Sequence, residues 1–186
     1  MRVLSVGFGL LFSTAVAVAQ APPPRAPAAT PAPARPPATL AQLMRGILFP
    51  NSNIIFDAQS NDPAAPKPKP AGTGALVDFC CVYTGWPVLE NAALALNEAI
   101  DLIAKPGRRC DNGKPAPVNE ATFKKGAQML RDASLKIYQL AKAKDLEKTS
   151  DAANDLADAC STCHEVYRDR GDANSPLRCV AGPAPK

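Results

Sequence analysis

The sequence predicts an all-α protein, and more specifically a four-helix bundle. Apolar residues recur at intervals of three and four along four separate segments, which is the spacing of amphipathic helices. No segment shows the alternation of apolar and polar residues that is typical of half-buried strands. Four amphipathic helices joined by loops bury their apolar faces against one another, and this arrangement is a bundle.

The N-terminus is typical of a secretory signal peptide over residues 1–19. Arg2 is followed by an apolar run, and Ala17-Val18-Ala19 has the small-x-small pattern of a cleavage site. The run is short for a membrane span, which needs about 20 residues. We therefore expect export to a Gram-negative periplasm. The alternative is an uncleaved anchor, and membrane attachment is expected only in that case.

A proline-rich spacer is expected to separate the signal from the folded domain. Eight of the 19 residues in 20–38 are proline, a composition that favours an extended polyproline conformation. The bundle is then assigned to residues 39–180 and a short tail to 181–186. A second proline-rich stretch, 62–70, is expected to form a loop within the domain.

The first helix is expected to begin at Thr39, because Gln42 three residues later completes a capping box. Its apolar face carries Leu40, Met44 and Ile47. Pro50 is expected to kink or interrupt this helix, since proline lacks the backbone N–H and clashes with the preceding turn. Residues 53–56 continue the helix beyond it.

The other three helices are expected from about 86 to 104, 119 to 144 and 146 to 170. The first of them has the clearest heptad, formed by Trp86, Leu89, Ala93, Leu96, Ile100 and Ile103. Pro87 lies in its first turn, where proline is tolerated, and Pro106-Gly107 ends it. Because the last connection is very short, the third and fourth helices are expected to be antiparallel neighbours.

The fourth helix contains Cys160-Ser-Thr-Cys163-His164, the C-x-x-C-H pattern of covalent haem c attachment. Helical spacing puts both thiols on one face for thioether formation with two vinyl groups, and the next residue, His164, can then ligate the iron. His164 is the single histidine of the chain. The alternatives are a thioredoxin-like motif, a zinc site and a plain disulfide framework.

With this motif in the last of four helices, the chain resembles the class II cytochromes c, which include cytochrome c′ and the cytochrome c556 type. Other shared features are Trp86, Ala93 and Glu98 in the second helix, Pro106-Gly107-Arg108 after it, and a methionine in the first helix. The resemblance implies one covalent haem c per chain between the first and fourth helices. It assigns attachment to Cys160 and Cys163 and proximal ligation to His164.

The identity of the sixth iron ligand distinguishes electron transfer from gas binding. Met44 lies where the c556 type places its methionine, and Met129 is a weaker candidate. A methionine thioether favours ferrous iron and electron transfer. Without it, the resemblance implies a five-coordinate iron that binds NO or CO, with Leu43, Met44 or Ile47 on the distal side.

Arginines near the haem form a second point of comparison with the family. Many relatives carry an arginine near a propionate four residues before the distal position, where this chain has Leu40. Arg45 is a candidate to replace it from another face of the helix. Arg168, one turn after His164, is a candidate to tune the haem electrostatically, with a solvated arginine at the helix end as the alternative.

The four other cysteines, Cys80, Cys81, Cys110 and Cys179, allow three pairings. The ends of the second and fourth helices lie at the same end of an up-down-up-down bundle. We therefore expect a Cys110–Cys179 disulfide. Cys80 and Cys81 then form a vicinal disulfide or remain thiols that face another partner.

The expected function is periplasmic electron transfer by a monohaem cytochrome that acts with redox partner proteins. A formal net charge of +4 without a basic cluster argues against a nucleic-acid binder. No nucleophile–base pair is evident, so no enzymatic activity is expected. A homodimer, and a haem subunit docked on a dehydrogenase, are further alternatives.

Overall fold

The computed structural model describes residues 35–66, 71–72, 74, 83–169 and 175–181. The described residues lie in one compact unit, Ala34–Lys186. The expected signal peptide, most of the spacer, and Cys80 and Cys81 lie outside the described ranges. Within those ranges, no helix is long and apolar enough to cross a membrane.

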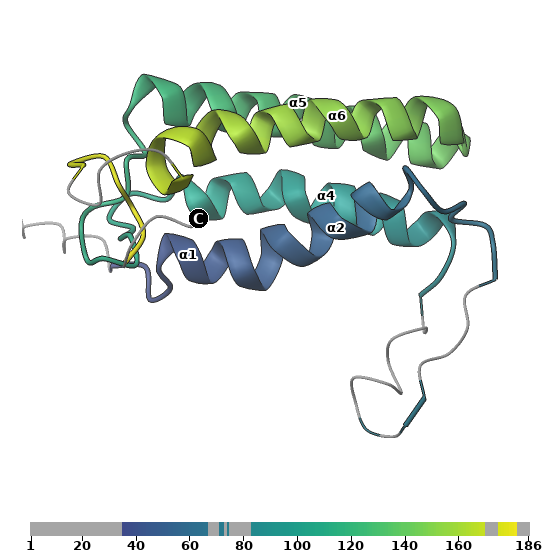
Figure 1. Cartoon of the computed structure of the whole chain (residues 1–186), viewed down its shortest axis with the longest axis horizontal. Helices are drawn as coiled ribbons and strands as arrows, with labels where there is room; N and C mark the ends of the chain where they lie inside the picture. Colours follow the sequence, from purple (N-terminus) through teal and green to yellow (C-terminus); the bar gives the residue numbers. More distant parts are fainter. Residues whose placement is uncertain (1–34, 67–70, 73, 75–82, 170–174, 182–186) are drawn as a thin grey trace, which may run out of the picture. The chain divides into compact units, whose positions relative to one another are not determined.

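Four long helical segments form the unit, and no strand accompanies them in the described part of the chain (Figure 1). The segments in chain order are α1–η1–α2 (Leu40–Leu43, Met44–Leu48, Phe49–Asp57), α4 (Trp86–Ile103), α5 (Ala121–Ala143), and α6 (Leu146–His164) with the π-helical turn η2 (Glu165–Asp169). The all-α prediction is therefore confirmed. The helix boundaries lie within a few residues of those expected from the sequence.

The first helical segment begins as the sequence predicts but is not broken by Pro50. Thr39 accepts a hydrogen bond from the Gln42 backbone N–H, and the Gln42 side chain accepts one from the Thr39 backbone. A π-helical turn, η1, precedes the proline, and the Phe49 N–H donates to the Met44 carbonyl. This wider turn accommodates the proline ring. The segment is therefore continuous, with a π turn where a kink or interruption was expected.

The π turn also shifts the apolar face of this segment. Leu40 and Leu48 are buried, whereas Ile47 is only partly buried. A π turn contains one residue more than an α turn, so Leu48 occupies the inward position that α-helical spacing assigned to Ile47.

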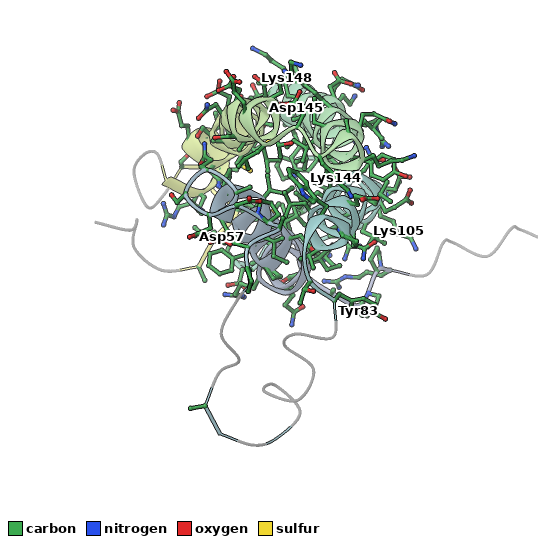
Figure 2. The ribbon with its side chains drawn as sticks, turned by 90° about the vertical axis from the view of Figure 1, so that its right-hand side faces the viewer. Asp57, Tyr83, Lys105, Lys144, Asp145 and Lys148 are labelled. Carbon is green, nitrogen blue, oxygen red and sulfur yellow. A yellow bond between two sulfur atoms is a disulfide. The ribbon has the colours of Figure 1, made fainter. Side chains whose placement is uncertain are left out.

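The α5–α6 connection is a two-residue turn, which makes these helices antiparallel neighbours (Figure 1). Lys144 ends α5 in the left-handed conformation with φ 56°. Asp145 caps α6 by accepting a hydrogen bond from the Lys148 backbone N–H. Asp145 and Lys148 lie together at this end of the bundle (Figure 2).

The core is built from the predicted heptads. The buried positions on α4 include Trp86, Leu89, Ala93, Leu96, Ile100 and Ile103. Viewed along the bundle, side chains extend from the helices into the space between them (Figure 2). Large rings are rare in this core, and alanines supply much of the helix contact.

The last residues of the expected spacer pack onto the folded unit. Pro36 is buried, and the Ala38 carbonyl accepts a hydrogen bond from the Arg108 guanidinium. The Leu40 N–H donates to the Arg109 carbonyl at 2.8 Å. These contacts join the start of α1 to the loop after α4 and so close one end of the bundle.

Candidate functional site

A cavity of about 300 Å³ lies at the end of the bundle where α1 and α5 begin and α4 and α6 end. This is the end opposite the α5–α6 turn. Its walls are mostly apolar side chains from all four helical segments, among them Leu40, Leu48, Leu96, Ile103, Phe123, Ala127, Leu130 and Ala159. Concave, mainly apolar sites with a few polar groups are the usual form of cofactor pockets.

The C-x-x-C-H residues line this cavity together. Cys160, Cys163 and His164 occupy the last turn of α6, and each is partly buried. Both cysteines are free thiols. Spacing of i and i+3 places the two thiols on the same face of the helix, as two-point covalent attachment requires.

The two thiols are held uncharged by their surroundings. Burial raises the pKa of Cys163 to about 11, and the neighbouring Cys160 adds to the rise. Burial also raises the pKa of Cys160, opposed by the positive charge of Arg168. Both groups are therefore protonated at neutral pH, which is the state compatible with apolar walls.

Met44 and Met129 differ in their position relative to the cavity. Met44, in the π turn η1, lines the cavity together with His164. Met129 is absent from the cavity lining, and its sulfur accepts a hydrogen bond from the Thr162 hydroxyl at 3.6 Å. Among the described residues, Met44 alone therefore brings a thioether to the cavity that His164 lines.

Other side chains expected near the distal position are placed differently. Leu43 and Ile47 pack against the hydrophobic core and do not line the cavity. Leu40 and Leu48 line it beside Met44. The change follows from the π turn, which shifts the inward-facing positions by one residue.

Within the described part of the chain, Arg45 and Arg168 lie in the cavity lining, and no acidic side chain accompanies them there. The Arg45 side chain is 69% exposed and forms a 3.6 Å ion pair with Asp111. Arg168, on η2, is exposed. The cavity is therefore lined mainly by apolar side chains, with the two arginines at its exposed parts.

The C-terminal segment supplies a wall that was not predicted from the sequence. Cys179 and Val180 line the cavity, and Cys179 forms a disulfide with Cys110. This pairing agrees with the expected one. The Cys179 N–H also donates to the Tyr167 carbonyl at 2.8 Å. The disulfide holds the segment against the loop after α4, and the hydrogen bond holds it against η2.

Three further residues at the site were missed by sequence reasoning. Tyr167 is buried, and its ring centroid lies 6.1 Å from that of Phe123. Burial raises the pKa of the Tyr167 hydroxyl. Gly126, on α5, is buried against α6. A glycine inside an amphipathic helix is the one local signal that pointed to such a contact.

Comparison with known proteins gives a partial match. Residues 118–168 match the family model described as Cytochrome C′, a stretch that contains α5, α6 and the C-x-x-C-H motif. Curated proteins and solved structures gave no match. The family match supports a c-type cytochrome with haem as its cofactor, a class that is generally not enzymatic and is typically exported. The resemblance to the class II cytochromes c is therefore confirmed, and the chain is similar to cytochrome c′ over residues 118–168.

Proposed function

We propose that this protein is a periplasmic electron carrier that holds one covalent haem c, whose iron would be bound by His164 and Met44. One observation carries the proposal. Two free thiols, the only histidine of the chain and one thioether line the same apolar cavity. When bound, haem c supplies an iron that carries one electron by changing between its ferric and ferrous states.

Each side chain has a distinct task in this proposal. Cys160 and Cys163 hold the cofactor through two thioethers on one face of α6. His164 follows directly and binds the iron from the same helix, so attachment and proximal ligation are coupled. The apolar walls exclude water from the site, which lowers the local dielectric constant and strengthens electrostatic interactions within the cavity.

Met44 favours electron transfer over gas binding. Its thioether is an uncharged, polarisable ligand that favours ferrous iron and raises the reduction potential. A methionine that binds the iron also occupies the position that NO or CO would take. The location of Met44 on a π turn supports this role, since such turns frequently occur at functional sites.

Optical spectroscopy of the purified holoprotein tests the proposal. Spectra are recorded in the oxidised and reduced states, with and without CO, for the wild type, Met44→Ala and Met129→Leu. We expect a low-spin wild type that does not react with CO and a Met44→Ala variant that is high-spin and CO-reactive. Met129→Leu is the matched control and retains the wild-type spectrum, because its sulfur contacts Thr162 outside the cavity lining.

A wild type that is high-spin and CO-reactive overturns Met44 ligation and favours a gas-binding cytochrome. A protein that matures without covalent haem overturns the proposal as a whole. Far-UV circular dichroism of each variant separates a lost ligand from a lost fold.

Export is tested independently of haem ligation. N-terminal sequencing of the mature protein from the periplasmic fraction is expected to begin at Gln20, directly after the Ala17-Val18-Ala19 pattern. A protein that retains Met1 and sediments with the membranes supports the uncleaved anchor instead.

A further inference from the structure

Gly126 occupies an unfavourable position for a glycine. It is the sixth residue of α5 (Ala121–Ala143), a helix of 23 residues, and it is buried. Glycine destabilises the interior of a helix relative to alanine because it loses more backbone freedom on folding. A buried glycine at such a position therefore requires a packing reason.

The packing reason is the sulfur of Cys163. A Cβ atom added to Gly126 would overlap Sγ of Cys163 on the neighbouring helix α6. The next nearest atoms, the Ala159 carbonyl oxygen and Thr162 Cγ2, would lie at 3.5 Å, which is ordinary contact. The backbone of α6 thus leaves room for a methyl group at position 126, and the Cys163 sulfur alone excludes it.

The Cys163 sulfur occupies a small recess on the first turns of α5. Its Sγ lies 4.0 Å from the Phe123 carbonyl oxygen, one turn before Gly126. Cys160 is not among the three atoms nearest to a Cβ at position 126, whereas Cys163 is the nearest. Of the two motif thiols, that of Cys163 is therefore the one that a side chain at position 126 would overlap.

We propose that Gly126 is a positioning residue for covalent attachment at Cys163. The inference rests on the proposed function, since it assumes that Cys163 forms a thioether. In that step the Cys163 S–H adds across a vinyl double bond of haem. A carbon–sulfur bond forms, the thiol hydrogen ends on the other vinyl carbon, and no net oxidation or reduction occurs. Because Gly126 has no side chain, the Cys163 sulfur can occupy the space next to α5 in which it lies.

The test compares Gly126→Ala with Gly46→Ala in holoprotein that has passed through haem attachment. Gly46 is the matched control, because it is also helical and a Cβ there would meet nothing within 4 Å. Pyridine haemochrome spectra report the number of vinyl groups left unsaturated. Alkylation under denaturing conditions followed by peptide mass analysis identifies which thiol stayed free.

We expect Gly126→Ala to lose the Cys163 thioether in part or in full while the Cys160 thioether persists. Its haemochrome band shifts to longer wavelength, and alkylated Cys163 is recovered. Gly46→Ala retains both thioethers. Complete attachment at both cysteines in Gly126→Ala overturns the inference.

A second comparison separates positioning from general packing. The single variant Cys163→Ala, which is expected to carry haem through Cys160 alone, is compared with the double variant that also carries Gly126→Ala. With no sulfur at position 163, the added methyl group has nothing to displace, so the double variant matches Cys163→Ala in haem yield and spectrum. A further loss in the double variant overturns the inference, and this arm is informative even if Gly126→Ala alone fails to fold. A wild type without covalent haem contradicts the proposed function itself, whereas intact thioethers in Gly126→Ala contradict only the role of Gly126.

Discussion

The Cys110–Cys179 disulfide closes a long covalent loop in the described part of the chain, and the effect of removing it on stability can be calculated. The two residues are 69 positions apart in the sequence, and their Cα atoms lie 4.8 Å apart. We consider the double variant in which Cys110→Ala is combined with Cys179→Ala. Alanine is chosen because both cysteines are buried and a polar replacement would add a separate cost.

The magnitude follows from the entropy of the unfolded chain. For a loop of 69 residues, the chain-entropy relation predicts a loss of about 4 kcal/mol in the free energy of unfolding at 25 °C. For a protein of this size, 1 kcal/mol corresponds to about 2–4 °C in Tm, so Tm is expected to fall by about 10 °C. The helices and the cavity face of α6 do not depend on the crosslink and are expected to persist.

Urea unfolding of the holoprotein, followed by far-UV circular dichroism, measures this loss. The wild type reduced with a thiol reagent is the matched control, since it lacks the crosslink without any substitution. Both samples are expected to unfold at a lower urea concentration than the oxidised wild type. If the double variant and the reduced wild type unfold at the same midpoint as the oxidised protein, the reasoning is refuted.

Two further predictions concern the helices that hold the site. Leu156 on α6 is fully buried at 0% exposure, so Leu156→Ala is expected to lower the free energy of unfolding, measured in urea, by about 2–5 kcal/mol. Leu135→Ala, at a site 43% exposed, is the control. An equal loss of stability in both variants contradicts the packing argument. Hydrogen bonds from the Lys148 side chain and backbone lower the pKa of Asp145. This contribution to stability is present above the ordinary carboxyl pKa of about 4 and is lost as pH falls through the lowered folded value. Asp145→Ala is therefore expected to lower Tm at pH 7 and to reduce the drop in Tm on acidification, and an unchanged pH profile would show that the cap is not coupled to folding.

Much of the site could be predicted from the sequence because its signals are local. The capping box at Thr39 and Gln42, the heptad that begins at Trp86 and the C-x-x-C-H motif each lie within a few turns of one helix. Backbone geometry alone places residues i and i+3 on one helix face, so the joint position of Cys160 and Cys163 needed no tertiary information.

The placement of Leu48 shows where a local rule failed. The 3.6-residue period predicted that Ile47 would face inward, but the π turn before Pro50 carries Leu48 there instead. The proline was visible in the sequence. Whether the helix would break, kink or widen at that point depends on the packing of the segment against α4 and α6, which the proline alone does not determine.

Taken by itself, the sequence determined the helices, the apolar faces of the last three of them and the C-x-x-C-H motif. The tertiary structure decided which methionine lines the cavity with His164, why α5 needs a glycine at position 126, and that Cys179 and Val180 form part of the wall. Periodicity and motif spacing describe one helix at a time. Helix packing sets whether the Met44 thioether reaches the cavity. It also sets how close the Cys163 sulfur lies to Gly126 on another helix, and only the folded chain contains that information.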